Sequence, residues 1–131
     1  MFIISVKIEF SAAHRIKGYK GNCSQFHGHN YKVEVNVKAD EVNKIGMCVD
    51  FRKLSKISKN AISYLDHKNL NDVPLFKKNN PTAESIAKFI YEKIKQQLKG
   101  ALSLYSVKVW ETDKYAVTYS ENKVNSEEKI S

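Results

Sequence analysis

Residues 27–38 read HGHNYKVEVNVK, and this stretch decides the fold. Over residues 31–38 apolar and polar side chains alternate one by one, which is the period of a strand with one buried and one wet face. A matching alternation runs over residues 2–10. Clean alternation is typical of antiparallel sheets with one covered face. We therefore expect two antiparallel strands here, joined by a loop over residues 16–25.

After Gly46 the apolar residues recur at steps of three and four, which is the period of an amphipathic helix. The first expected helix has Asp50 as its candidate N-cap. Its apolar positions are Phe51, Leu54, Ile57, Ala61 and Leu65. The second has Asn80 or Thr82 as its candidate N-cap and stops at Gly100. Its apolar positions are Ala83, Ile86, Ala87, Ile90, Ile94 and Leu98.

Alternation returns over residues 105–109 and again over residues 115–119, with a tight connection between them. The predicted order of elements is therefore β-β-α-α-β-β, which makes an α+β domain. We assign residues 1–121 to this domain and expect residues 122–131 to form a polar tail.

The composition limits the classes of protein to which this chain can belong. It has 131 residues, of which 42% are hydrophobic, enough for one domain with a core and too many for a disordered chain. Its net charge of +8 comes from 20 lysines and 2 arginines spread through every element, so we expect no nucleic-acid partner. No apolar run is long enough to span a membrane. Two cysteines without a secretory signal favour the reducing cytosol.

Three of the four histidines form a pattern that favours a metal site. His27 and His29 lie two residues apart on one face of a strand, and His14 continues the apolar face of the other strand. If the two strands pair, the three imidazoles converge. Three such ligands with a vacant fourth position are typical of catalytic zinc, whereas a single histidine is usually an ordinary surface or hydrogen-bonded residue. Iron and copper accept imidazole too, so the pattern leaves the metal open.

The two cysteines have different surroundings. Cys23 lies four residues before His27 among polar residues, where a nearby cation and imidazole would lower its pKa and make it a usable base or nucleophile. Cys48 lies in an apolar run, which is typical of a small buried hydrophobe.

Two further signals come from carboxylates. Asp66 and His67 follow the first helix, and taken alone this pair is typical of a helix terminus with its charge complement. Glu111 keeps the parity of Tyr105, Val107 and Val109, so we expect all four on the buried face of their strand. A carboxylate there either pairs with a buried cation or receives a ligand that offers hydrogen-bond donors.

Five blocks of the chain, in this order, resemble the signature of the 6-pyruvoyltetrahydropterin synthase and 6-carboxytetrahydropterin synthase family. The resemblance spans residues 2–120, which is nearly the whole chain. The blocks are Phe10-Ser11-Ala12-Ala13-His14-Arg15 with Cys23 and His27-Gly28-His29-Asn30-Tyr31; Gly46-Met47-Cys48-Val49-Asp50-Phe51; Leu65-Asp66-His67-Lys68-Asn69-Leu70-Asn71; Asn80-Pro81-Thr82-Ala83-Glu84; and Val109-Trp110-Glu111-Thr112.

The resemblance implies a tunnelling fold, in which a four-stranded antiparallel sheet carries two helices on one face. Three subunits would join their sheets into a barrel, and two trimers would stack into a homohexamer. It also implies a role for each site residue. The zinc ligands would be His14, His27 and His29; the catalytic set would be Cys23, Asp66 and His67; and the pterin anchor would be Glu111.

The substrate that the resemblance implies is 7,8-dihydroneopterin triphosphate. One branch of the family yields 6-pyruvoyltetrahydropterin. The other releases acetaldehyde and triphosphate and yields 6-carboxy-5,6,7,8-tetrahydropterin, on the path to 7-deazaguanine bases of tRNA, as in queuosine biosynthesis. Three residues separate Cys23 from His27, a short spacing that resembles the carboxy branch, and a cysteine at this position differs from the aldolase variants that carry glutamate nearby.

We therefore expect the carboxy product, with 6-pyruvoyltetrahydropterin synthase as the alternative. A non-enzymatic zinc-binding module is a more remote alternative, and it would use Cys23 as a fourth ligand.

Overall fold

The computed structural model describes residues 1–21 and 24–121. Cys23 and the expected tail at residues 122–131 therefore lie outside the described residues. The elements in chain order are β1 (Phe2–His14), β2 (His27–Ala39), α1 (Phe51–Ile62), β3 (Lys68–Asn69), the 3-10 helices η2 (Leu70–Asp72) and η3 (Pro74–Lys77), α2 (Ala83–Gln97), β4 (Ser103–Trp110) and β5 (Ala116–Tyr119). The prediction of an α+β domain is confirmed.

The strands form one sheet in the order β3-β1-β2-β4-β5, and every pairing except that of β3 is antiparallel. The four long strands are those expected, whereas β3 corrects the expected count of four. It pairs in parallel with Ala12 and Ala13 over two residues only, which is too short to give a periodic signal. The turn before it is tied to the edge of β1, because the Ser11 backbone N–H donates to Asp66 and the His67 N–H donates to the Ser11 carbonyl.

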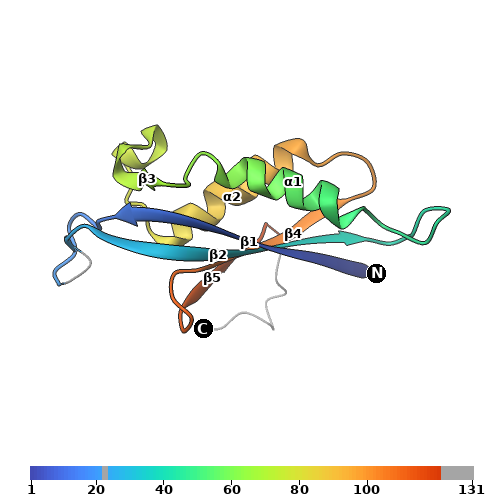
Figure 1. The fold of residues 1–131 in the computed structure, drawn as a ribbon, viewed down its shortest axis with the longest axis horizontal. Helices are drawn as coiled ribbons and strands as arrows, with labels where there is room; N and C mark the ends of the chain where they lie inside the picture. The colour runs from blue at the N-terminus through green and yellow to red at the C-terminus, as the bar shows by residue number, and fades with distance from the viewer. Residues whose placement is uncertain (22–23, 122–131) are drawn as a thin grey trace.

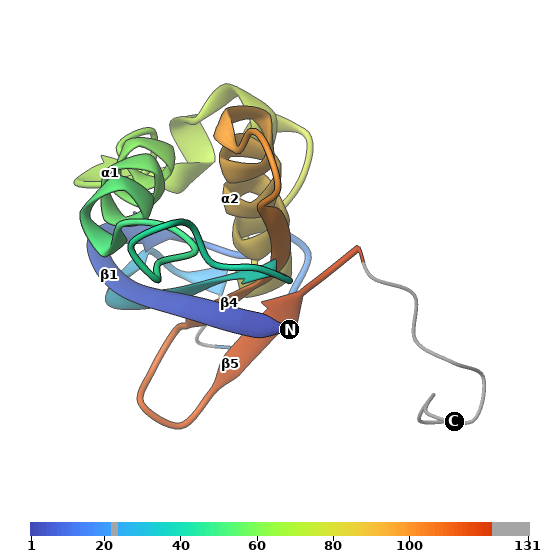
Figure 2. The ribbon, with the colours of Figure 1, turned by 90° about the vertical axis from the view of Figure 1, so that its right-hand side faces the viewer.

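Both helices lie on the same face of the sheet, as Figures 1 and 2 show. The inward-facing valines of β2 have no exposed surface, and neither do the apolar residues of α1 and α2 that cover them. These residues form the centre of the core: Val33, Val35, Val37, Leu54, Ala61, Ile86, Ile90 and Ile94. Neither α1 nor α2 has the length and apolar character needed to cross a membrane.

The predicted N-cap of α1 is confirmed, and one of the two candidate N-caps of α2 is the observed one. Asp50 caps α1 by accepting from the Arg52 backbone N–H. Thr82 caps α2 by accepting from the Ser85 N–H. Asn80 instead exchanges two hydrogen bonds with the backbone of Lys17, at 2.8 and 2.9 Å, and so fixes the chain just after β1.

The predicted burial of one β4 side chain was wrong. Tyr105 was expected to share the buried face with Val107, but it is 37% exposed, and Leu104 packs inward instead. The reason is a β-bulge: Val37 pairs with Leu104 while Val35 pairs with Val107, so β4 holds one extra residue. The parity that leads from Val107 to the end of β4 is unaffected.

Candidate metal centre and acid–base dyad

The pairing of β1 with β2 brings the three histidines together. His14 lies directly opposite His27, and Ala12 lies opposite His29, so all three rings emerge from one face at one end of the sheet. The ring centroids are 4.5–5.2 Å apart. Below them, Tyr31 stacks on Phe10 with 4.8 Å between ring centroids, which closes the core beneath the cluster.

Backbone carbonyls fix the tautomers of two of these rings. The His14 Nδ1–H donates to the carbonyl of Pro81 and the His27 Nδ1–H donates to that of Gln25, both at 2.7 Å. In neutral rings this leaves both Nε2 atoms as lone-pair acceptors, and they face each other at 3.0 Å. Two acceptors at that distance cannot hydrogen-bond to each other, so the arrangement is suited to a cation between them.

Glu111 completes the cluster. Its Oε1 lies 2.9 Å from His29 Nε2 and 3.5 Å from His14 Nε2, and the side chain is 27% exposed. The contact between Glu111 Oε1 and His29 Nε2 is short but is not a hydrogen bond. The buried Nε2 atom therefore has no hydrogen-bond partner among the described residues. One nitrogen from each histidine and one Glu111 oxygen all lie within 4.8 Å of one another.

The electrostatics favour the metal-binding forms of His29 and Glu111. Burial lowers the pKa of His29, although the Glu111 carboxylate opposes that shift, so its ring is neutral at physiological pH. The His14 ring beside it holds the pKa of Glu111 below its usual range, so this carboxylate is ionised. Neutral imidazole and ionised carboxylate are the ligand forms that metal binding requires. The buried nitrogen without a partner, the facing acceptors and the ligand spacing all fit a metal ion.

Two neighbours of the cluster were not found from the sequence. The Tyr31 hydroxyl lies 3.3 Å from His14 Nδ1, and burial raises the pKa of this phenol, so it stays protonated. The second is the Pro81 carbonyl, which is a backbone group and carries no side-chain signal. Tyr31 could have been identified, because it shares the face of His29 two residues along the strand.

Asp66 and His67, the predicted catalytic pair, lie in contact with each other outside the histidine cluster. His67 Nδ1 lies 2.9 Å from Asp66 Oδ1, and the His67 side chain is 82% exposed. His67 is also the one non-glycine residue in the described chain with a left-handed backbone, at φ +59°. Such a conformation is uncommon outside glycine and is often found where a side chain must be aimed for function.

The dyad faces a different side of the sheet from the three histidines. His67 and Lys68 line an open hollow with both strands of the pair, and the strand residues that line it are Ser11, Ala12, Ala13, Gly28, His29 and Asn30. Ser11, Ala13 and Asn30 alternate with the histidine positions, so their side chains point to the face opposite the histidine rings. Within one chain, His67 is therefore not aimed at the histidine cluster.

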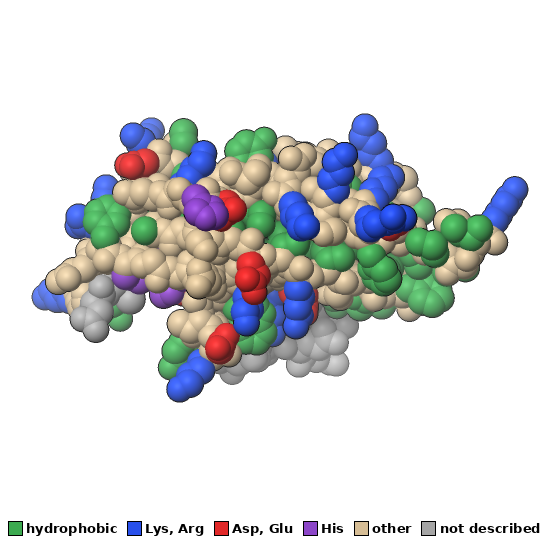
Figure 3. All heavy atoms as spheres, viewed as in Figure 1, with side chains coloured by type: hydrophobic (Ala, Val, Ile, Leu, Met, Phe, Trp, Pro, Cys, Tyr) green, Lys and Arg blue, Asp and Glu red, His purple; other side chains and the backbone are tan. Residues whose placement is uncertain are grey.

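The remaining site predictions have separate outcomes. Cys23 is outside the described residues, so its distance from the cluster stays a prediction. Cys48 is a free, partly buried thiol in the loop before α1, in keeping with its expected packing role. The lysines spread along the length of the face in Figure 3, with acidic side chains between them.

Comparison with known proteins identifies the family. The family model for 6-pyruvoyl tetrahydropterin synthase matches residues 3–122. A dihydroneopterin monophosphate aldolase of Pyrococcus furiosus is 36% identical, with 87% of this chain and 93% of that protein covered. A 6-carboxy-5,6,7,8-tetrahydropterin synthase of Haemophilus influenzae is 33% identical, with 92% of this chain and all of that protein covered.

A solved structure agrees with these sequence relatives. The 6-pyruvoyl tetrahydropterin synthase of Caenorhabditis elegans superposes with a TM-score of 0.79 at 34% identity, covering 93% of this chain and 98% of that one. Because the family model spans nearly the whole described chain, this protein belongs to the 6-pyruvoyl tetrahydropterin synthase family of pterin-metabolising enzymes.

Proposed function

We propose that this chain is a zinc-dependent lyase that converts 7,8-dihydroneopterin triphosphate to 6-carboxy-5,6,7,8-tetrahydropterin, with release of acetaldehyde and triphosphate. The observation that carries the proposal is the cluster of His14, His27 and His29 with facing Nε2 atoms. The cluster supplies a site for a Lewis acid at one end of the sheet, in a family whose members are named for reactions of pterins.

His14, His27 and His29 would hold the zinc ion. Bound there, zinc polarises the hydroxyl oxygens of the substrate side chain and makes the neighbouring C–H more acidic. The choice of zinc follows from the donor set, since three neutral imidazoles with an open fourth position are typical of catalytic zinc sites. The Pro81 and Gln25 carbonyls keep two of the rings in the required tautomer.

The protein's own residues then handle protons and hold the pterin. The Cys23 thiolate removes a proton from the substrate side chain. His67 binds Asp66 through Nδ1, so its Nε2 is the atom that accepts or returns a proton. The Glu111 carboxylate accepts two hydrogen bonds, one from the ring N–H and one from the amino group of the pterin.

The choice of the carboxy branch rests on the short spacing from Cys23 to His27. Overall identity does not separate the candidates, because relatives named for three different reactions are 33–38% identical to this chain. The 6-pyruvoyl product is therefore the second candidate, and the match to the Caenorhabditis elegans structure favours it. The cysteine at position 23 argues against the aldolase reaction. The low cysteine content favours the cytosol as the compartment.

We also propose that the active enzyme is a hexamer built from two trimers. β3 covers only Ala12 and Ala13, and Asp66 and His67 bind the backbone of Ser11, so residues 2–10 leave the edge of β1 open within the described chain. An open edge of this length is a template for pairing with another strand. Since His67 faces away from its own histidine cluster, a neighbouring chain would supply it to the site.

The test is to incubate the purified, zinc-loaded protein with 7,8-dihydroneopterin triphosphate and to identify the products by mass. We expect 6-carboxy-5,6,7,8-tetrahydropterin together with acetaldehyde. The matched control is His14→Ala, which should give neither. A 6-pyruvoyl product would overturn the carboxy assignment and establish the second candidate. No turnover in a fully metallated protein would favour a non-enzymatic module, with Glu111 as a fourth ligand.

A further inference from the structure

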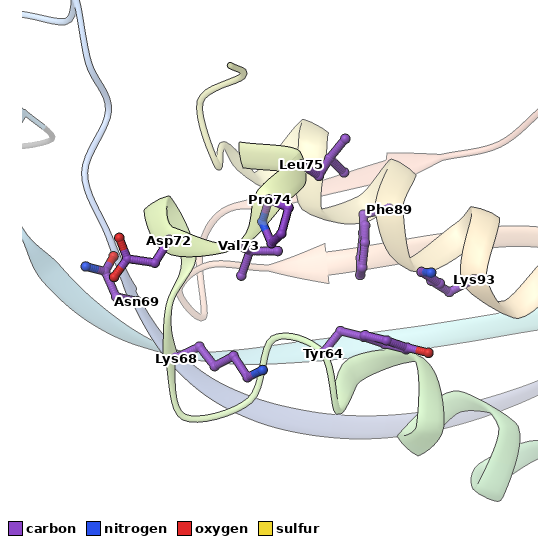
Figure 4. A pocket seen from close by; sticks show the side chains of 9 residues that line it. All are labelled: Tyr64, Lys68, Asn69, Asp72, Val73, Pro74, Leu75, Phe89 and Lys93. Carbon is purple, nitrogen blue, oxygen red and sulfur yellow. The ribbon is translucent and has the colours of Figure 1, made fainter. Parts of the chain in front are cut away.

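A second hollow lies on the helix side of the molecule, and it shares no residue with the histidine cluster. It is bounded by the chain after α1, by β3 and the 3-10 segments, and by one face of α2 (Figure 4). Its volume is about 570 Å³, within the usual range for small-molecule sites. The lining residues are Tyr64, Lys68, Asn69, Asp72, Val73, Pro74, Leu75, Phe89 and Lys93.

The walls of this hollow are aromatic and apolar. The Tyr64 and Phe89 rings meet edge to face, with 6.1 Å between centroids and 79° between planes. Val73 and Pro74 lie next to Phe89 on the side of the hollow away from α1 (Figure 4). Tyr64 is 50% exposed, so part of its side chain is available to a ligand. A flat ring can pack against such walls at little entropic cost.

The charged groups around it are mainly cationic. Lys93 Nζ lies 4.6 Å from the centroid of the Tyr64 ring and 5.6 Å from that of Phe89. Lys68 extends along the same hollow toward Tyr64, whereas the Asp72 side chain points away from the aromatic pair (Figure 4). Among the ion pairs of the described residues, none involves Lys68 or Lys93. Two ammonium groups without a carboxylate partner, one of them over the aromatic rings, complement an anion.

We propose that this hollow is a binding site for a planar aromatic anion, distinct from the pterin site. The ring of the ligand packs against Tyr64, Phe89 and Val73. Its carboxylate or other anionic group lies toward the ammonium groups of Lys68 and Lys93. Charge complementarity excludes a cationic aromatic ligand, and the apolar walls disfavour a small inorganic anion.

The test uses 2-naphthoate as the probe and the full-length protein labelled in its Val and Leu methyl groups. Val73 and Leu75 report on the hollow, and Val35 in the core is the internal reference. We expect saturable shifts of the Val73 and Leu75 methyl signals, with Val35 unchanged. The neutral amide 2-naphthamide should bind several-fold more weakly, because it gains no charge-assisted contact.

Variants separate this site from general attraction to a basic surface. Tyr64→Ala should weaken binding by about tenfold, since it removes an aromatic wall. Lys93→Gln should weaken it roughly threefold to tenfold. Lys88→Gln is the matched control, because Lys88 lies on the same helix outside the hollow, and it should leave the affinity unchanged.

Three results would overturn the proposal. The first is the absence of saturable shifts at Val73 and Leu75, as would happen if another copy of the chain filled the hollow. The second is an equal loss of affinity in Lys88→Gln and Lys93→Gln. The third is equal affinity for the naphthoate and the naphthamide. Unchanged melting temperatures and Val35 signals show that each variant is folded.

Discussion

The histidine cluster and the Asp66–His67 turn are built in opposite ways. The cluster sits on two long paired strands; His14 is 1% exposed, and its Nδ1 donates to the Pro81 carbonyl. The turn follows a helix, and His67 is 82% exposed with a left-handed backbone. The cluster brings four possible metal ligands together within one chain, whereas Asp66 and His67 form an exposed pair that is turned away from those ligands.

Metal binding and proton transfer between subunits require different degrees of burial. A metal site needs ligands held in fixed positions before the ion arrives, and strands with backbone carbonyl partners provide that. A proton-transfer group that serves a neighbouring subunit has to be exposed in the isolated chain. Mutations in the two regions should therefore affect different measurable quantities.

The largest effect is expected for His14→Ala. Losing one of three imidazoles should cost more metal affinity than the roughly 10–100-fold loss typical of an outer-shell partner, and turnover should disappear with the metal. His67→Ala is the matched control, which should lose activity but keep its zinc. The measurement is metal content by mass spectrometry after dialysis. Full zinc occupancy in His14→Ala would refute the ligand assignment.

The second largest effect is expected for Cys23→Ala, with Cys48→Ala as its matched control. Cys23→Ala should retain zinc while turnover falls by about 10²–10⁴, because a positioned base is lost. Cys48→Ala should keep its turnover and lose only about 1 kcal/mol of unfolding free energy. Both are measured by steady-state kinetics, metal analysis and denaturant unfolding. Loss of zinc in Cys23→Ala would indicate a closed structural site instead of a catalytic one.

A smaller effect is expected for Glu111→Gln. The amide places a donor opposite the donors of the pterin, so kcat/KM should fall by tenfold or more, equivalent to about 1.5–3 kcal/mol. The fall should come mainly through KM, with zinc content unchanged. Since Glu111 Oε1 lies 2.9 Å from His29 Nε2, metal content decides between two roles. Zinc loss with normal KM in the loaded enzyme would make Glu111 a metal ligand.

The smallest effect concerns the support of β1. Asn71 exchanges two hydrogen bonds with the backbone of Arg15, the residue after His14. Asn71→Ala should lower the free energy of unfolding by about 1–2 kcal/mol, since two net hydrogen bonds are lost. Zinc stoichiometry should not change, because the Pro81 carbonyl still orients His14. If zinc is lost, the strand end depends on Asn71 more than its hydrogen bonds suggest.

Much of the fold could be predicted because its signals are local. The alternation in residues 2–10 and 31–38, and the caps at Asp50 and Thr82, follow from side-chain periodicity and backbone hydrogen bonding. The two-residue β3 and the bulge at Tyr105 could not be predicted, because both depend on pairing with a distant segment. Neither leaves a periodic trace in the sequence.

The candidate site also has features that could be predicted from the sequence and features that could not. The parity of His14, His27 and His29 sufficed to predict that they converge once the strands pair. The tautomers could not be predicted, because they depend on the carbonyls of Gln25 and Pro81. The direction of His67 was also hidden, since it depends on a backbone conformation that histidine rarely adopts.

The most direct test of a site shared between chains is complementation between two inactive variants. Cys23→Ala and His67→Ala subunits are mixed under conditions that exchange protomers, and turnover of 7,8-dihydroneopterin triphosphate is followed, with each variant alone treated identically. If one chain supplies Cys23 and its neighbour supplies His67, some sites receive both intact residues, and activity returns. If each chain builds its own set, every site keeps one defect. A mixture that exchanges subunits and yet stays inactive would contradict the shared site.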